Sequence, residues 1–499
     1  MERTREKAHL LGLAMVGIPL AALLLLPYAT NGLWFDDAIN SQTWGMLNRF
    51  DVSLWDFSLR VINVWLIDYG RILLCWPVVY GFFYITRDPG VIRIVDVALV
   101  ITHIAVVVVL LRQLRLSWRA VGLFILFVLS LFQIRTGDDP IAAYASFCQL
   151  LGIGLTISLI FFGEWYQTGS VKYLAASTVL ATLLTLCYEL NFVFLPIAFT
   201  CIAIAPHKRR ALSFLIVTLP FALWIAANLY LKQHTAHPYS GTSFGSLTAV
   251  PVAYAKQLVA TLPGSFYFLS LEPEFGFKRL ASAVMSNATA MLVFLLSFMT
   301  YVHLFRQPSQ PADPLNLRLL AGAGAFVFFP PALIAISAKY QAELGWGDAH
   351  IPVYYQYFGL ALVGAVAFER LLFRLTKTQV VLVGLIFSVY VSSNWILNVQ
   401  TAHRVDNVFQ EPRSTFVAAM KDGILGPVRN GDTLEIVDQP TYINGNLIYQ
   451  TIQKNVFIPR EAVVQAWFNS APRPDAQRFS LYRDVSAGNA WHLKRISIP

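Results

Sequence analysis

The sequence predicts an all-α polytopic membrane bundle of about eleven transmembrane helices, and three observations lead to this prediction. Of the 499 residues, 56% are hydrophobic and only 13% are charged, whereas a soluble chain carries about 25% charged residues. Apolar runs of roughly 16–21 residues recur along the chain, long enough to cross a bilayer as helices. Lys and Arg gather in short segments between these runs. The net charge of +9 therefore indicates membrane orientation, and nucleic acid is excluded as a partner.

Eleven apolar segments are the predicted spans: residues 9–28, 94–111, 120–134, 142–162, 173–188, 191–206, 212–231, 284–304, 319–338, 353–368 and 379–397. The first follows a basic N-terminal end and is longer than the core of a cleaved signal peptide, so we expect it to be retained. A twelfth run, residues 71–86, is short and contains Pro77 near its centre. We expect it to dip into the outer leaflet without crossing the membrane.

Positive charge sets the orientation. With eleven spans and a cytoplasmic N-terminus, the basic clusters near residues 3–7, 112–119, 172, 208–210, 306–318 and 370–377 all face the cytoplasm. The large loops then lie outside: residues 29–93, the turn after Arg135, 232–283, 339–352 and everything after about 398. We therefore expect any chemistry on the outer face. Sparse loops and the absence of disulfide cysteines favour a bacterial inner membrane, with this face toward the periplasm, and the endoplasmic reticulum is the alternative.

Two outer regions have a predicted structure of their own. In the first outer loop, Trp55, Leu59, Ile62 and Leu66 recur at helical spacing, which predicts an amphipathic helix at the interface, and residues 38–50 show a weaker version. Residues 399–499 are more polar and read as a small α/β domain. Its helix is expected at 413–423 and its strands at 432–438, 455–459 and 491–499. The division is thus a membrane bundle over 1–398, including the loop 29–93, and a periplasmic domain over 399–499.

Two acid pairs follow spans on the same predicted face. Asp36 and Asp37 stand in "WFDDAIN" after the first span, and Asp138 and Asp139 stand in "RTGDDP" after the third. Asp is a favoured helix N-cap, and Pro140 suits a first helical turn, so each pair has a purely structural interpretation. Capping needs only one acid, however, and both pairs lie on one face. A catalytic role is therefore a second interpretation of these acids, in addition to helix capping.

Taken together, these features resemble the GT-C superfamily of membrane glycosyltransferases, which use sugars carried on polyprenyl phosphate. The resemblance is in the order of spans and loops and extends over about 400 residues. It rests on "WFDDA" after the first span, interfacial helices in a long first loop, the basic turn "RQLRLSWRA", "RTGDDP", and the late loop "KYQAELGWGDAHIPVYYQYFG". It implies that Asp36 or Asp37 is a general base for an acceptor hydroxyl, and that a single displacement inverts the anomeric carbon. The acceptor, a glycan, lipid or protein, stays open.

The remaining candidates are substrate contacts. A phosphate leaving group needs positive charge or hydrogen-bond donors, for which Arg135, Lys339, Tyr340 and His350 are candidates. Asp138 and Asp139 would orient substrate, or join the first pair in holding Mg or Mn, a cofactor that the sequence leaves open. Glu189 lies in a tight outer turn, where an acid invites a functional interpretation. Tyr354 belongs to an aromatic group that could stack on sugar, line a lipid groove or form an interfacial belt.

Other interpretations remain. Glu343 and Asp348 lie near His350 in the sequence, which suggests a metal cluster. We favour two other roles for His350: a phosphate contact, or a loop histidine whose hydrogen bonds are satisfied by the protein. The four cysteines lack the spacing of a zinc site or disulfide framework. An O-antigen-type polymerase or ligase would also use lipid-linked sugars, with Arg and His in a late loop. A transporter or flippase would place ionisable groups within its spans, where only His103 is central.

Overall fold

The computed structural model is mostly helical, with a small sheet near the C-terminus. It describes residues 2–33, 36–86, 88–144, 146–205, 210–269, 277–306, 317–372, 375–429, 431–437, 456, 475–484, 486 and 490–496. Within these ranges, six helices are long and apolar enough to cross a membrane. They are α1 (Glu2–Ala29), α6 (Pro89–Gln113), α8 (Phe147–Thr168), α11 (Arg210–His234), α15 (Ala288–Arg306) and α19 (Lys377–Lys421). The chain is therefore a multi-pass membrane protein.

The other five predicted spans are helical as well. They correspond to α7 (Trp118–Leu131), α9 (Val171–Cys187), α10 (Phe194–Ala203), α16 (Leu317–Ala335) and α18 (Val353–Leu372). α10 is preceded by a 3-10 turn, η2 (Glu189–Val193). The span predicted over 142–162 was wrong at its start, because α8 begins only at Phe147. Residues 140–144 form turns instead, held by hydrogen bonds to the buried carboxylate of Asp139.

The first outer loop folds as a chain of short helices. These are α2 (Asp36–Asn40), α3 (Thr43–Phe50), α4 (Leu54–Asn63), the π-helical turn η1 (Val64–Asp68) and α5 (Trp76–Ile85). The predicted helix around 55–66 is confirmed, and Ser53 caps it by accepting a hydrogen bond from the backbone N–H of Asp56. α5 has 10 residues, or about 15 Å of helix, half the thickness of the hydrocarbon core. By length alone it is too short to cross the membrane, in agreement with the expectation that residues 71–86 do not form a span.

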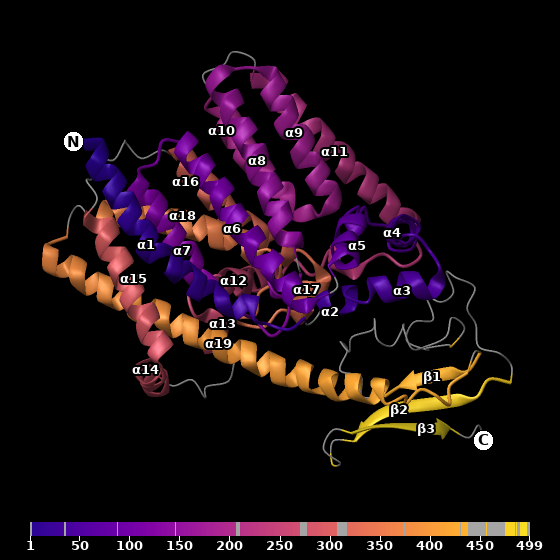
Figure 1. Cartoon of the computed structure of the whole chain (residues 1–499). Helices are drawn as coiled ribbons and strands as arrows, with labels where there is room; N and C mark the ends of the chain where they lie inside the picture. The colour runs from indigo at the N-terminus through magenta and orange to yellow at the C-terminus, as the bar shows by residue number, and fades with distance from the viewer. Residues whose placement is uncertain are drawn as a thin grey trace.

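Further short helices lie between the long ones: η3 (Ser240–Thr242), α12 (Val250–Ala260), α13 (Ser265–Leu269), α14 (Phe277–Ser286) and α17 (Ala338–Glu343). α17 packs against η3 and α16, and α12 packs against α16. Figure 1 shows α2, α5 and α17 gathered at one end of the group formed by α6, α8 and α9, with α19 running past them toward the sheet.

The C-terminal region combines the end of α19 with three strands. β1 (Thr433–Ile436) pairs in parallel with β2 (Arg478–Asp484), which pairs antiparallel with β3 (Ala490–Ile496). Phe416 of α19 packs edge-on against Trp491, with Leu434 and Leu481 buried beside them. The strands predicted at 432–438 and 491–499 and the helix at 413–423 are confirmed. The strand predicted at 455–459 lies outside the described residues except for Val456, which is not in a strand.

α19 itself continues without interruption through residue 398, where the sequence suggested a domain boundary. The helical half of the C-terminal region is thus an extension of the last apolar helix. Asp406, on this extension, accepts a hydrogen bond of 2.9 Å from the backbone N–H of Gly32. The last helix therefore contacts the segment that leads into the Asp36–Asp37 pair.

Candidate active site

A pocket of about 210 Å³ lies at the end of the bundle where α2, α5 and α17 meet. Seven of its lining residues are charged, histidine or amide side chains: Asp36, Asp37, Asn40, Arg71, Asp138, Lys339 and His350. Eight others are aromatic: Trp65, Trp76, Phe83, Tyr144, Phe147, Tyr188, Tyr239 and Tyr340. Most belong to the segments predicted to lie outside the membrane. The pocket thus brings together the first acid pair, one acid of the second pair, and the late loop.

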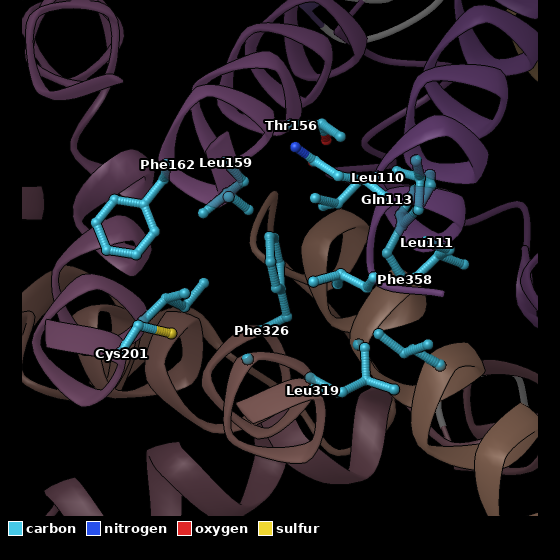
Figure 2. A pocket seen from close by; sticks show the side chains of 18 of the residues that line it. Leu110, Leu111, Gln113, Thr156, Leu159, Phe162, Cys201, Leu319, Phe326 and Phe358 are labelled. Atoms are coloured by element: carbon cyan, nitrogen blue, oxygen red, sulfur yellow. The ribbon is translucent and has the colours of Figure 1, made fainter. Parts of the chain in front are cut away.

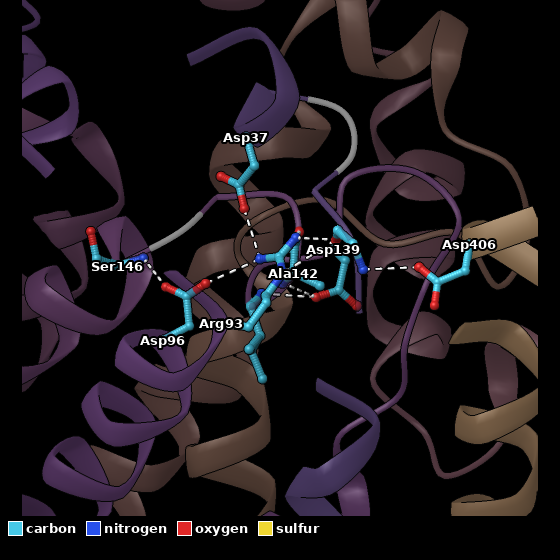
Figure 3. A network of polar contacts seen from close by, with 9 residues as sticks. Asp37, Arg93, Asp96, Asp139, Ala142, Ser146 and Asp406 are labelled. Atoms are coloured by element: carbon cyan, nitrogen blue, oxygen red, sulfur yellow. Dashed lines mark hydrogen bonds and ion pairs between the residues drawn. The ribbon is translucent and has the colours of Figure 1, made fainter. Parts of the chain in front are cut away.

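Asp37 anchors the fold around the pocket. Its carboxylate is 1% exposed and accepts a 2.9 Å hydrogen bond from Arg93 of α6. Arg93, equally buried, also donates to Asp96 and to the backbone carbonyls of Gly32 and Ala142. Figure 3 shows this guanidinium at the centre, with acids on several sides. One buried cation thereby joins the loop after α1, the start of α2, α6 and the turn before α8.

Asp36 has different surroundings. It lines the pocket, is only partly buried, and its carboxylate has no hydrogen-bond or ion-pair partner among the described residues. Burial and the nearby carboxylate of Asp138 raise the pKa of Asp36 to about 6, although Lys339 acts in the opposite direction. A carboxylate with that pKa is ionised at neutral pH and is still a better proton acceptor than an ordinary aspartate.

The second pair divides in the same way. Asp139 is fully buried, and its carboxylate accepts the backbone N–H groups of Arg135, Ile141 and Ala142 at 2.7–3.0 Å. It holds the turn, as the capping interpretation of this pair implied, and does not line the pocket. Asp138 does line the pocket, where it accepts a 2.6 Å hydrogen bond from the hydroxyl of Tyr144. Its other oxygen lies 3.8 Å from His350 Nε2.

The late loop supplies a cation and two rings. Lys339 Nζ lies 3.8 Å from the exposed carboxylate of Glu343 and 3.5 Å from the hydroxyl of Tyr239. The rings of Tyr340 and His350 pack at 4.3 Å between centroids. Burial lowers the pKa of His350 to about 4, against the opposing effect of Asp138. His350 is therefore neutral at physiological pH, and Lys339 carries the positive charge.

Arg71 is a pocket residue that sequence reasoning missed. Its guanidinium donates two hydrogen bonds of 2.6–2.7 Å to Glu189 and lies over the rings of Trp65, Tyr188 and Tyr239. Burial alone would lower the pKa of Arg71, but the Glu189 carboxylate raises it above its usual value. Glu189, a predicted substrate contact, thus holds Arg71 in place from behind the pocket wall. The sequence signal for Arg71 was a cation at the start of the ambiguous run 71–86.

Two predicted substrate contacts lie away from the pocket. Arg135 is buried and donates to the carbonyls of Ala260 and Gly347 and to the hydroxyl of Tyr357. Tyr354 is fully buried, and its hydroxyl lies 3.0 Å from His103 Nδ1 in the interior of the bundle. Both side chains are bonded inside the protein, Arg135 in the segment that follows α7 and Tyr354 near the start of α18.

A metal cage made from all four acids does not fit this geometry. Asp36 has no partner among the described residues and Asp138 accepts a hydrogen bond from Tyr144, while Asp37 and Asp139 are held by Arg93 and by backbone N–H groups. Across the part of the chain that the structure describes, no group of three or more His, Cys, Asp or Glu side chains is arranged to hold a metal ion. A divalent ion here would need oxygens from the substrate in addition to Asp36 and Asp138.

Comparison of the chain with models of known protein families, with curated proteins and with solved structures found no match. The expected resemblance to the GT-C superfamily therefore rests on the sequence motifs alone.

Proposed function

We propose that this protein is an inverting glycosyltransferase that moves a sugar from a polyprenyl-phosphate donor to a glycan, lipid or protein acceptor. The observation that carries the proposal is Asp36, a pocket carboxylate with a raised pKa and no partner among the described residues. It lies beside a cation, Lys339, and aromatic rings, at the end of a membrane bundle. With the orientation that positive-inside bias predicts, that end faces outward, and we propose the periplasm of a bacterial inner membrane as its location.

The proposed reaction is one displacement. The Asp36 carboxylate accepts the proton of the acceptor hydroxyl while that oxygen forms a bond to the anomeric carbon. The bond from the anomeric carbon to the phosphate oxygen breaks, and polyprenyl phosphate leaves with the electron pair. A phosphate is a good leaving group and needs no proton, so one base is sufficient. Attack opposite to the leaving group inverts the anomeric centre, as in glycosidases that use water.

Charge in the pocket suits this displacement. Lys339 is the pocket cation whose nearest acid, Glu343, is exposed and 3.8 Å away, so its ammonium group is available to the departing phosphate. The Arg71 guanidinium is already paired bidentately with Glu189 and contributes a fixed positive wall. The rings of Trp65, Trp76 and Tyr239 line the pocket and give it an apolar wall, with polar groups beside them to orient a sugar.

His350 is a poorer base than Asp36. A general base is most effective when its pKa lies near the working pH. The pKa of His350 is lowered to about 4, whereas that of Asp36 is raised to about 6. We assign His350 to substrate contact, with Asp138 and Tyr340. If the reaction uses Mg²⁺ or Mn²⁺, Asp36 and Asp138 are the residues that would hold it, and the ion would neutralise phosphate charge.

A second function is favoured by one observation, that Lys339 and His350 of the late loop both line the pocket. An O-antigen-type polymerase or ligase would depend on such a late-loop histidine. This second function predicts that His350→Ala abolishes activity while Asp36→Asn retains it. The glycosyltransferase proposal predicts the reverse.

The test is sugar transfer by the purified protein in detergent, from a panel of hexosyl and pentosyl polyprenyl phosphates to membrane extracts that contain envelope acceptors. Asp36→Asn should lower the transfer rate by about 10²–10⁴-fold, the usual contribution of a positioned base. Asp56→Asn, an exposed acid in the same outer loop, is the matched control and should stay near wild type. Parallel reactions with a chelator report on metal dependence. Equal rates in the two variants, or no transfer from any donor, would contradict the proposal.

A further inference from the structure

A second, larger cavity of about 560 Å³ lies inside the bundle, away from the candidate active site. It extends along α6 from His103 to Gln113, past the end of that helix to Arg115, and along α8 from Thr156 to Gln167. These helices meet the candidate active site at their opposite ends, where Asp96 and Ser146 lie. The cavity therefore opens toward the end of the bundle that carries the basic turns. Figure 2 shows Leu110, Leu159, Phe162 and Phe326 around its centre.

The walls are apolar, and the polar groups at the inner end are already bonded to protein. His103 contacts Tyr354 through Nδ1 and Thr156 through Nε2, and the Thr156 hydroxyl donates to the Gly152 carbonyl. Water is retained in cavities that offer it two or more polar partners, whereas apolar cavities take apolar ligands. A cavity of about 150 Å³ holds the six carbons of benzene. This one has room for roughly twenty carbons on the same scale.

The depth of the cavity matches one membrane leaflet. His103 and Gln113, both in α6 and in the cavity wall, are ten residues apart, which is about 15 Å of helix. Half of a bilayer's hydrocarbon core is about 15 Å. A single acyl chain of a membrane lipid spans that distance, and a longer polyprenyl chain would not fit inside.

The mouth carries positive charge. Arg115 and Gln167 line it and are exposed, and within the described ranges the Arg115 guanidinium makes no hydrogen bond or ion pair with protein. Gln113 Oε1 is buried near the mouth and has no hydrogen-bond partner in the described part of the chain. A cation beside an acyl-sized cavity fits a lipid phosphate, and the free amide oxygen can accept a hydrogen bond from a headgroup hydroxyl.

We propose that this cavity binds one acyl chain of an anionic glycerophospholipid from the cytoplasmic leaflet, with its phosphate against Arg115. Leu319, Gly322, Ala323 and Phe326 form the face of α16 toward the cavity. A Cβ added at Gly322 would have no heavy atom within 4 Å. Leu at this position would therefore extend into the space intended for the lipid without a clash.

The same helix offers a matched control. Gly324 does not line the cavity, and a Cβ there would meet only Phe328, at 3.9 Å. Gly322→Leu and Gly324→Leu thus change the same residue type on the same helix. Both variants therefore include the effect of replacing a helical glycine by leucine on stability. Only Gly322→Leu also fills the cavity.

Native mass spectrometry and thermal unfolding of delipidated full-length protein, with and without added phosphatidylglycerol, test the proposal. Wild type and Gly324→Leu should bind one lipid and gain Tm when it is added. Gly322→Leu should lose about a hundredfold in affinity, because several methylene groups lose their site. Its Tm without lipid should exceed that of Gly324→Leu, since the new side chain fills the cavity. A misfolded variant would instead show a lower Tm.

A second pair of variants tests the proposed contact between Arg115 and the lipid phosphate. Arg115→Gln should weaken phosphatidylglycerol binding and reduce its sensitivity to salt, whereas Lys172→Gln, an exposed cation of the same basic end that is not in the cavity wall, should not. Unchanged lipid binding in Gly322→Leu would overturn the proposal. Polyprenyl phosphate as the retained lipid, or zwitterionic lipid binding as tightly as phosphatidylglycerol, would also overturn it.

Discussion

Asp36 and Asp37 are neighbours in the chain, yet their carboxylates meet different surroundings. The Asp37 carboxylate is buried against Arg93, while that of Asp36 lines the pocket near Asp138 and Lys339. Asp138 and Asp139 repeat the contrast, since Asp139 bonds backbone N–H groups and Asp138 faces the pocket. In each pair, one acid stabilises the local fold and leaves the other for the pocket.

The raised pKa of Asp36 leads to a pH prediction. Because its pKa is about 6, the base is protonated below that pH, and kcat/KM should fall about tenfold per pH unit there. Lys339→Gln removes a nearby positive charge, so it should move this acid limb to higher pH. Asp138→Asn removes a negative charge and should move it to lower pH.

Transfer rates measured across the acid limb check this prediction, with Lys172→Gln as the control cation far from the pocket. A limb that stays in place in both Lys339→Gln and Asp138→Asn would show that Asp36 does not control it.

At the scale of elements, the N-terminal part of α6 connects the segments around the pocket. Arg93→Met keeps an unbranched side chain but leaves Asp37 and Asp96 buried without their cation. Removing one partner of a buried ion pair costs about 3–5 kcal/mol. We expect a clear loss of thermal stability, measured by unfolding in detergent, and partial recovery when Asp96→Asn is added. No recovery in the double variant would argue against charge as the cause.

Much of the fold was predictable at this scale because the bilayer restricts the choice. Backbone polar groups have no water in the hydrocarbon core, so long apolar runs must be helical. Helical spacing likewise identified α4 from Trp55 and Leu59. The start of α8 was missed because Ser146 adopts a left-handed backbone conformation (φ 61°) and donates its N–H to Asp96, which separates the turns at 140–144 from the helix. This contact depends on a buried side chain, which the local sequence does not reveal.

The candidate site was predictable only in part. The paired acids and the late loop are visible as motifs, and the structure brings Asp36, Asp138, Lys339 and His350 to one pocket. The partners that decide their roles lie far away in sequence: Arg93 is 56 residues from Asp37, and Glu189 is 118 residues from Arg71. A charge in an apolar helix gives no sign of its partner. The sequence likewise does not show that Arg135 and Tyr354 have buried partners, so both were predicted to contact substrate.

At the scale of the whole molecule, the bundle and the C-terminal region are connected by α19. A chain ending after Asn398 loses the bond between Asp406 and Gly32, whereas one ending after Gly423 keeps it and loses the sheet together with the hydrogen bond from Arg49 to the carbonyl of Val456. Both should insert, because their helices satisfy their own backbones. The shorter chain should lose more stability and more transfer activity. Equal behaviour of the two truncations would assign the effect to the sheet.

Orientation gives a second prediction at this scale. Eleven spans place both the candidate active site and the C-terminal region outside, and the basic turns inside. A reporter fused after Gly423 should therefore read as periplasmic, and one inserted at 207–210 as cytoplasmic. A cytoplasmic signal from the first fusion would contradict the outer active site.

The most direct test of the central claim compares Asp36→Asn with Asp37→Asn by two readouts, transfer rate and Tm. Asn retains the shape of Asp but is a poor proton acceptor. Asp36→Asn should lose about 10²–10⁴-fold in transfer with little change in Tm, because its carboxylate bonds no described group. Asp37→Asn should lower Tm, because Arg93 loses a buried ionic partner. Near-wild-type transfer in Asp36→Asn, or a Tm loss confined to that variant, would contradict the account.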